Sequence, residues 1–200
     1  EQEIDSTLQV EAFSSTCKPS TTHSMVNTIK QCYMQAIYLI STDDPYMKVE
    51  AMKILHELVY EVKPNSKEVI FWQSHAAVDL ADLYLVGVEG KDYLDENNNI
   101  CADTFVEADL MKAFSLYRRA LVRGCTDGVS AMAEIYMMLG DYRHSAELYA
   151  SSVKYGYRHS SDAQRALDYM VSSGKIDYIP EVYFEPDGKP SLDYIITYRP

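Results

Sequence analysis

The sequence predicts an all-α fold, an α-solenoid of antiparallel helical hairpins with an extended or hairpin-like C-terminal tail. Three observations support this prediction. Apolar residues recur at three- and four-residue steps through most of the chain, which places one apolar stripe on each helix. Glycines follow several of these periodic segments, where helices commonly end. Short motifs also recur at an offset of 32 residues, and repeats of this length indicate stacked supersecondary units.

Composition divides the chain into three parts. Residues 1–22 are polar and rich in Ser and Thr, and they lack a sustained period, which predicts a polar N-terminal arm. Residues 23–174 carry the helical pattern and form the predicted helical-repeat domain. Residues 175–200 are rich in Tyr and contain four prolines, which argue against a helix. The Asp187-Gly188 pair in that last part is a turn signal and favours a small hairpin or an extended tail.

The first two helices are predicted from Met25 to Ile40 and from Pro45 to near Pro64. Each carries its apolar residues on one face. Asp44 is expected to be the N-cap of the second helix. Pro45 then occupies the first helical position, where its missing N–H leaves no hydrogen bond unmade.

Helical periodicity continues in five further segments. Their connections are short, except for a predicted insertion loop at about residues 88–108. Gly124, Gly156 and Gly174 each follow one of the segments and are expected to adopt the left-handed conformation that ends a helix. The five segments are Val69 to Val86, Asp109 to Val122, Val129 to Leu139, Tyr142 to Tyr155 and Asp162 to Val171.

Two pairs of short motifs form the internal repeat. SLYRRALVRG at 115–124 matches ELYASSVKYG at 147–156, with Leu, Tyr and Gly aligned at an offset of 32 residues. DLADLY at 79–84 matches AMAEIY at 131–136, with Ala and Tyr aligned at an offset of 52 residues. This second offset also becomes about 32 if the long loop is an insertion of about 20 residues.

These motifs resemble the Sel-one-like repeats, a branch of the tetratricopeptide-like helical hairpins. The resemblance covers about residues 76–170, and the second copy, LGDYRHSAELY, is similar to an ordinary tetratricopeptide repeat. It implies a curved stack of hairpins with a concave groove and a protein-binding role. The residues that carry the first copy are Leu80-Ala81, Tyr84 and Gly87, then Asp109, Lys112-Ala113, Tyr117, Ala120 and Gly124.

The residues of the repeat pattern are assigned to packing and not to chemistry. Alanine is small enough for close helix approach, while tyrosine fills the space between hairpins. The assigned packing residues are Ala81, Tyr84, Ala113, Tyr117, Ala120, Gly124, Ala133, Tyr136, Ala146, Tyr149 and Gly156.

Oxygen-bearing side chains at alternate positions in the insertion loop raise the question of a calcium site. Counted from Asp95, two asparagines and Asp103 occupy ligand positions of an EF-hand loop. That loop also requires Gly at position 6 and Glu at position 12, where this chain has Ile100 and Val106. The sequence therefore favours a surface insertion between two helices, with partner contact as the second choice and an irregular cation site as the remaining alternative.

No local pattern points to a catalytic or metal site. The cysteines Cys17, Cys32, Cys101 and Cys125 lack the paired spacing of a zinc site, so reduced thiols are expected, with two distant disulfides as the alternative. The histidines show no ligand spacing, and neither a nucleophile elbow nor a phosphate-binding loop occurs. We therefore predict no catalytic residue, no cofactor and no metal.

The net charge of −12 argues against partners that are themselves anionic. It would repel nucleic-acid phosphates and anionic lipids. No apolar run is long enough to cross a bilayer, so a soluble chain without direct membrane insertion is expected. The compartment stays open, and it includes an organelle reached after removal of a targeting segment.

Seventeen tyrosines favour protein partners, because aromatic side chains are enriched at protein interfaces. The candidates for partner binding are Tyr178, Tyr183, Tyr194 and Tyr198 in the tail, with packing on the chain's own last helix as the alternative. The expected function is a non-catalytic protein-binding scaffold or adaptor, and the alternative is a structural subunit of a large multiprotein assembly. An enzyme is the third hypothesis, and it would require a deep pocket with converging acidic or histidine residues.

Overall fold

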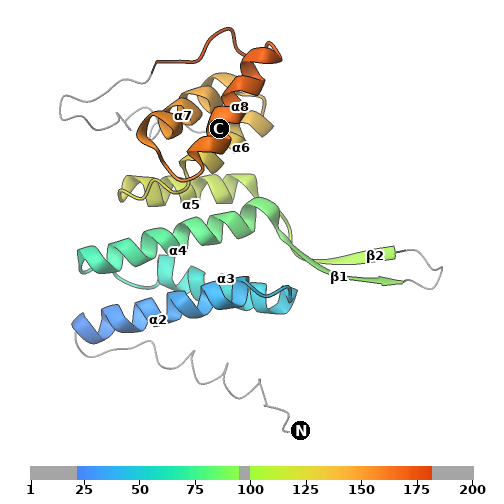
Figure 1. Ribbon diagram of the computed structural model, residues 1–200. Helices are drawn as coiled ribbons and strands as arrows, with labels where there is room; N and C mark the ends of the chain where they lie inside the picture. The colour runs from blue at the N-terminus through green and yellow to red at the C-terminus, as the bar shows by residue number, and fades with distance from the viewer. Residues whose placement is uncertain (1–21, 95–99, 182–200) are drawn as a thin grey trace.

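The computed structural model describes residues 22–94 and 100–181, which are mostly helical (Figure 1). This confirms the helical character that the sequence predicts. The predicted N-terminal arm and the turn in the C-terminal tail lie outside the described residues. The helices are α2 (Thr22–Ile40), α3 (Pro45–Tyr60), α4 (Lys67–Val86), α5 (Leu110–Val122), α6 (Val129–Met138), α7 (Tyr142–Tyr155) and α8 (Ser160–Ser172).

Side-chain caps fix where several helices begin. Asp44 accepts a hydrogen bond from the backbone N–H of Tyr46 at 2.9 Å, and Pro45 is the first residue of α3, as predicted. Such caps satisfy backbone donors that have no partner inside the helix. The corresponding caps of α4, α5 and α7 are Ser66, Asp109 and Asp141.

Glycine follows the ends of α5, α7 and α8, as the sequence predicts. Gly124, Gly156 and Gly174 have φ angles of +90°, +63° and +68°. A residue with a Cβ atom adopts this left-handed region only with strain. The chain therefore turns at these positions without steric cost.

The helices pack mainly on their neighbours in sequence, and α2 also contacts α4 across α3. Figure 1 shows α2 to α5 lying one above the other, with α6, α7 and α8 at the far end. Buried side chains form one continuous core, which runs from Ile29 in α2 to Met170 in α8. Within the described residues, no helix combines the length and the apolar character that crossing a bilayer requires.

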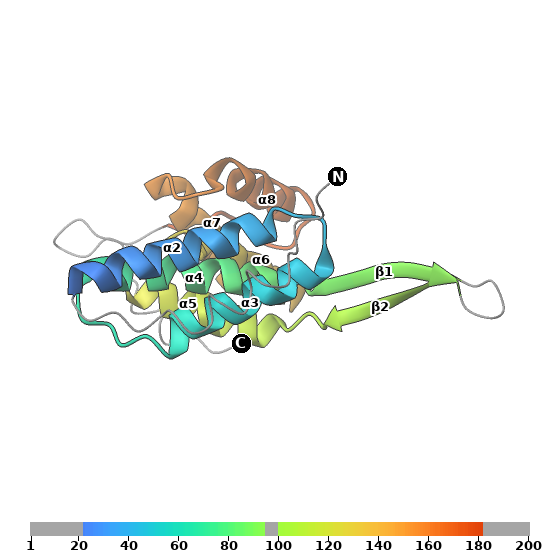
Figure 2. The same cartoon turned by 90° about the horizontal axis from the view of Figure 1, so that it is seen from below.

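A β-hairpin stands where the sequence predicts an insertion loop. Strand β1 (Val88–Leu94) pairs antiparallel with β2 (Ile100–Val106), and both views show the hairpin projecting from the helices (Figures 1 and 2). Its base is anchored by Val88, which is buried, and by an edge-to-face contact between Phe105 and Tyr46 with ring centroids 4.7 Å apart. The all-α prediction is incomplete here. The Asn and Asp residues of this segment favour turns, and this signal is stronger than that of the strand-forming residues beside them.

Most of the side chains that suggested a calcium site in the insertion loop are not described. Residues 95–99 lie outside the described residues, and so does the side chain of Asp103.

Gly128, at the start of α6, provides a test of how closely α5 and α6 approach. A Cβ atom at this position would overlap Cδ1 of the fully buried Tyr117 and lie 3.0 Å from its Cγ. We expect Gly128→Ala to lower the free energy of unfolding by about 1–3 kcal/mol, the usual effect of overpacking, measured by urea unfolding. Gly124→Ala is the control: it meets open space and should lose about 1 kcal/mol through backbone strain alone. A loss at Gly128 no larger than in that control would contradict the packing described.

Candidate functional site

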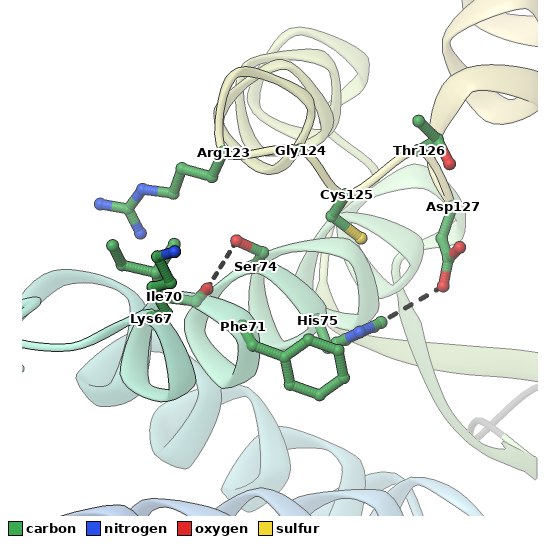
Figure 3. Close-up of a pocket in the computed structure, with 10 residues that line it drawn as sticks. All are labelled: Lys67, Ile70, Phe71, Ser74, His75, Arg123, Gly124, Cys125, Thr126 and Asp127. Atoms are coloured by element: carbon green, nitrogen blue, oxygen red, sulfur yellow. Dashed lines mark hydrogen bonds and ion pairs between the residues drawn. The ribbon is translucent and has the colours of Figure 1, made fainter.

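Two neighbouring cavities share one residue, Asp127. The larger, of about 580 Å³, lies between the first half of α4 and the connection from α5 to α6 (Figure 3). The smaller, of about 280 Å³, lies between α4, α6 and α8. Because Asp127 lines both, the two cavities are neighbours and we describe them together.

The smaller cavity is lined by carboxylates from four parts of the chain, and we call it the acidic groove. Two basic side chains lie at its α8 end. Arg158 Nη1 is 3.8 Å from Asp127 Oδ2, and His159 Nδ1 is 3.6 Å from Asp162 Oδ2. Four carboxylates line the groove against the one guanidinium of Arg158, so the groove has an acidic surplus. Its carboxylates are Asp82, Asp127, Glu134 and Asp162.

Tyrosines from two helices hold the aspartates of α4. The Tyr33 hydroxyl of α2 donates to Asp79 Oδ2 at 2.7 Å, and the Tyr117 hydroxyl of α5 donates to Asp82 Oδ1 at 2.5 Å. Residues three apart share one helix face, so both aspartates point to the same side of α4. The two hydrogen bonds therefore join α2, α4 and α5 at the edge of the groove.

Burial shifts the pKa values of these two tyrosines and two aspartates. Burial raises the pKa of the Tyr33 and Tyr117 hydroxyls well above their ordinary range, so both remain donors at neutral pH. Burial also raises the pKa of the Asp79 carboxyl, against the opposing effect of the hydrogen bond from Tyr33. The pKa of Asp82 is raised by burial in the same way, against the hydrogen bond from Tyr117.

The larger cavity brings together His75, Cys125 and Asp127. Figure 3 shows the His75 ring on α4 facing the Cys125 thiol and the Asp127 carboxylate on the α5–α6 connection. His75 Nδ1 is 3.6 Å from Asp127 Oδ2, and the Phe71 ring packs against the imidazole with centroids 4.3 Å apart. Burial raises the pKa of the Cys125 thiol, while a hydrogen bond from the backbone of Asp127 opposes that rise. This donor set could bind a metal ion.

The residues assigned to repeat packing occupy the interior of the helical region. Tyr84 is half-buried, and Lys112 Nζ lies 4.0 Å from its ring centroid. Gly124 and Gly156 are exposed at the ends of α5 and α7. The buried members are Ala81, Ala113, Ala120, Ala133 and Ala146 together with Tyr117, Tyr136 and Tyr149.

One of the four tail tyrosines falls within the described residues. Tyr178 follows α8 and is 74% exposed, so it does not pack on the last helix. The stretch just before it does pack there, because Lys175 donates its backbone N–H to the carbonyl of Met170 at 2.8 Å. Tyr183, Tyr194 and Tyr198 lie outside the described residues.

Sequence reasoning did not predict a site at either cavity, and it assigned the lining residues Gly124 and Tyr149 to packing. His75 and Cys125 are 50 residues apart in the chain and meet through the packing of α4 on α5. The only local signal is the Cys-x-Asp triplet at 125–127 after a helix-ending glycine. Both cysteine side chains that the structure describes, Cys32 and Cys125, are thiols and not halves of a disulfide.

Comparison of the chain with protein-family models, with curated proteins and with solved structures finds no match.

Asp79→Asn tests the burial of that carboxyl. Because the Asp79 pKa is raised above the unfolded value of about 3.9, the carboxyl favours folding below about pH 4 and loses this contribution as the pH rises through its folded pKa. We expect the fall in unfolding free energy between about pH 4 and about pH 7 to be smaller in the variant, measured by urea unfolding at constant ionic strength. Glu57→Gln, on the exposed face of α3, is the control. Equal pH dependence in Asp79→Asn and the unchanged protein would contradict this expectation.

Proposed function

We propose that this chain is a non-catalytic protein-binding scaffold or adaptor built from tetratricopeptide-like helical hairpins, and that it binds a basic segment of a partner protein in the acidic groove. The observation that carries the proposal is the groove itself, where carboxylates from α4, α6, α8 and the α5–α6 connection converge. A cationic peptide offers the complementary charge. The overall charge of −12 would further attract such a partner.

The stacking of the helices supports the solenoid part of the proposal. Pairs of adjacent helices pack closely, and the alanines of the repeat pattern are fully buried where they meet. In a solenoid, the first helices of successive hairpins line one face. Helices α2, α4, α6 and α8 would be those first helices, and α4, α6 and α8 line most of the acidic groove, to which α7 adds Tyr149.

The groove is held in place before any partner arrives. Tyr117 fixes the Asp82 carboxylate through its hydroxyl, and Ser130 on α6 hydrogen-bonds both Ser152 on α7 and the carbonyl of Arg158. A site that is already ordered loses less conformational entropy on binding. Arg158 pairs only loosely with Asp127 and its side chain is 53% exposed, so an incoming lysine or arginine can take its place.

The projecting hairpin favours the alternative function, a structural subunit of a large assembly. Strands β1 and β2 extend beyond the helices in both views (Figures 1 and 2). An arm of this kind buries surface only against a neighbour. A subunit of this type would aggregate when purified alone, whereas an adaptor would remain a stable monomer, and light scattering distinguishes the two.

Neutralising the groove tests the proposed function. The variant Asp82→Asn/Glu134→Gln/Asp162→Asn removes three groove carboxylates while retaining hydrogen-bonding side chains. We expect it to bind Lys- and Arg-rich peptides at least about tenfold more weakly than the unchanged protein, because close charge pairs contribute at least about 1.4 kcal/mol. The measurement is fluorescence anisotropy with a panel of labelled basic peptides.

The matched control is Glu57→Gln/Glu61→Gln/Glu68→Gln, which makes the same change in net charge on exposed positions away from the groove. It should bind the peptides as the unchanged protein does. An equal loss of affinity in both triple variants would show that only the net charge matters. Absence of binding to every basic peptide would contradict the proposal outright.

A further inference from the structure

The structure places three side chains with metal-binding atoms around one point in the larger cavity. One nitrogen of His75, the sulfur of Cys125 and one carboxylate oxygen of Asp127 all lie within 4.8 Å of one another. We propose that these three residues bind a zinc ion, with the fourth position open to the cavity. This inference does not depend on the proposed peptide-binding role.

The spacing of the three atoms fits a tetrahedral ion. Zinc binds imidazole nitrogen and carboxylate oxygen at about 2.0–2.2 Å and thiolate sulfur at about 2.3 Å, so two ligands of one ion are about 3.3–3.8 Å apart. His75 Nδ1 and Asp127 Oδ2 are already 3.6 Å apart. The remaining separations are at most 4.8 Å and need to close by up to about 1.5 Å, which side-chain rotation can supply.

The nature of the three donors selects the metal. A thiolate and an imidazole are the ligands that zinc prefers, whereas magnesium and calcium require sets of oxygens. Three protein ligands with an open fourth position are typical of zinc sites that also bind water or a ligand. The fourth position here faces a cavity of about 580 Å³, which has room for either.

The backbone around the three residues is fixed. The N–H of Cys125 donates to the carbonyl of Ala120 at 3.0 Å, and the N–H of Val129 donates to the carbonyl of Thr126 at 3.1 Å. Gly128 packs against Tyr117, so the connection cannot shift outward without opening a gap above that ring. The connection therefore presents Cys125 and Asp127 to α4 in a defined geometry.

Neighbouring side chains orient the ligands. The Phe71 ring packs edge-on against the imidazole of His75 and limits its rotation. Arg158 Nη1 lies 3.8 Å from Asp127 Oδ2 and competes for this carboxylate, but its exposed side chain can turn to solvent. Lys67 and Arg123 also line the cavity.

A zinc ion bound by these three residues would link α4 to the α5–α6 connection. These segments otherwise meet through side-chain packing, the hydrogen bond from Arg123 Nη1 to Gln73 Oε1 at 3.3 Å and the weak pair between His75 and Asp127. A ligand that binds only the folded chain shifts the folding equilibrium toward it. Bound zinc is thus expected to raise the thermal midpoint of the chain.

The test is titration of the full-length protein, without a histidine tag, with Zn²⁺ and separately with Co²⁺. We expect one Zn²⁺ per chain by isothermal titration calorimetry. Bound Co²⁺ should show a thiolate-to-cobalt charge-transfer absorption in the near ultraviolet, because Cys125 is a ligand. Cys125→Ser, His75→Gln and Asp127→Asn should each weaken Zn²⁺ binding at least about tenfold, and Cys125→Ser should abolish the charge-transfer band.

Matched controls remove the same chemical groups elsewhere. Cys101→Ser deletes another thiol and His56→Gln deletes an exposed imidazole, and neither should change the stoichiometry or affinity for Zn²⁺. Circular dichroism confirms that each variant is folded. Failure of the unchanged protein to bind Zn²⁺, a Co²⁺ complex without the charge-transfer band, or full affinity in Cys125→Ser would each overturn the proposal.

Discussion

The close approach of α4 and α5 determines the geometry of both cavities. Fully buried alanines on each helix, Ala81 on α4 with Ala113 and Ala120 on α5, allow the two backbones to come together. The buried Tyr117 then reaches across from α5 to Asp82 on α4, and its ring supports Gly128 at the start of α6. One tyrosine thus fixes an aspartate of the acidic groove and the connection that carries Cys125 and Asp127.

The helices were predictable from the sequence because their signals are local. Apolar periodicity, the Asp44 and Pro45 start of α3 and the three left-handed glycines depend on residues only a few positions apart. The β-hairpin was not predicted, because pairing Val88 with Val106 is a contact across eighteen positions that no short pattern reports. In that segment the turn-forming Asn and Asp residues are a stronger local signal than the strand-forming residues that flank them.

The candidate site was less predictable than the fold, for a related reason. Motif searches recognise ligands at fixed short spacings, whereas His75 lies on α4 and Cys125 lies 50 positions later, on the α5–α6 connection. The Tyr33–Asp79 and Tyr117–Asp82 hydrogen bonds likewise join residues 46 and 35 positions apart. The repeat pattern did single out Tyr117 as a packing residue, but nothing in the sequence indicated that its hydroxyl would reach an aspartate of the groove.

Asp127 lines both cavities and has a single carboxylate to offer. A cation that draws this carboxylate toward His75 withdraws negative charge from the side facing Arg158, and the reverse also holds. Occupants of the two cavities would therefore show negative cooperativity, and thermodynamic reciprocity requires each to weaken the other by the same factor. Because the two cavities share this side chain, the occupancy of each cavity would affect the occupancy of the other.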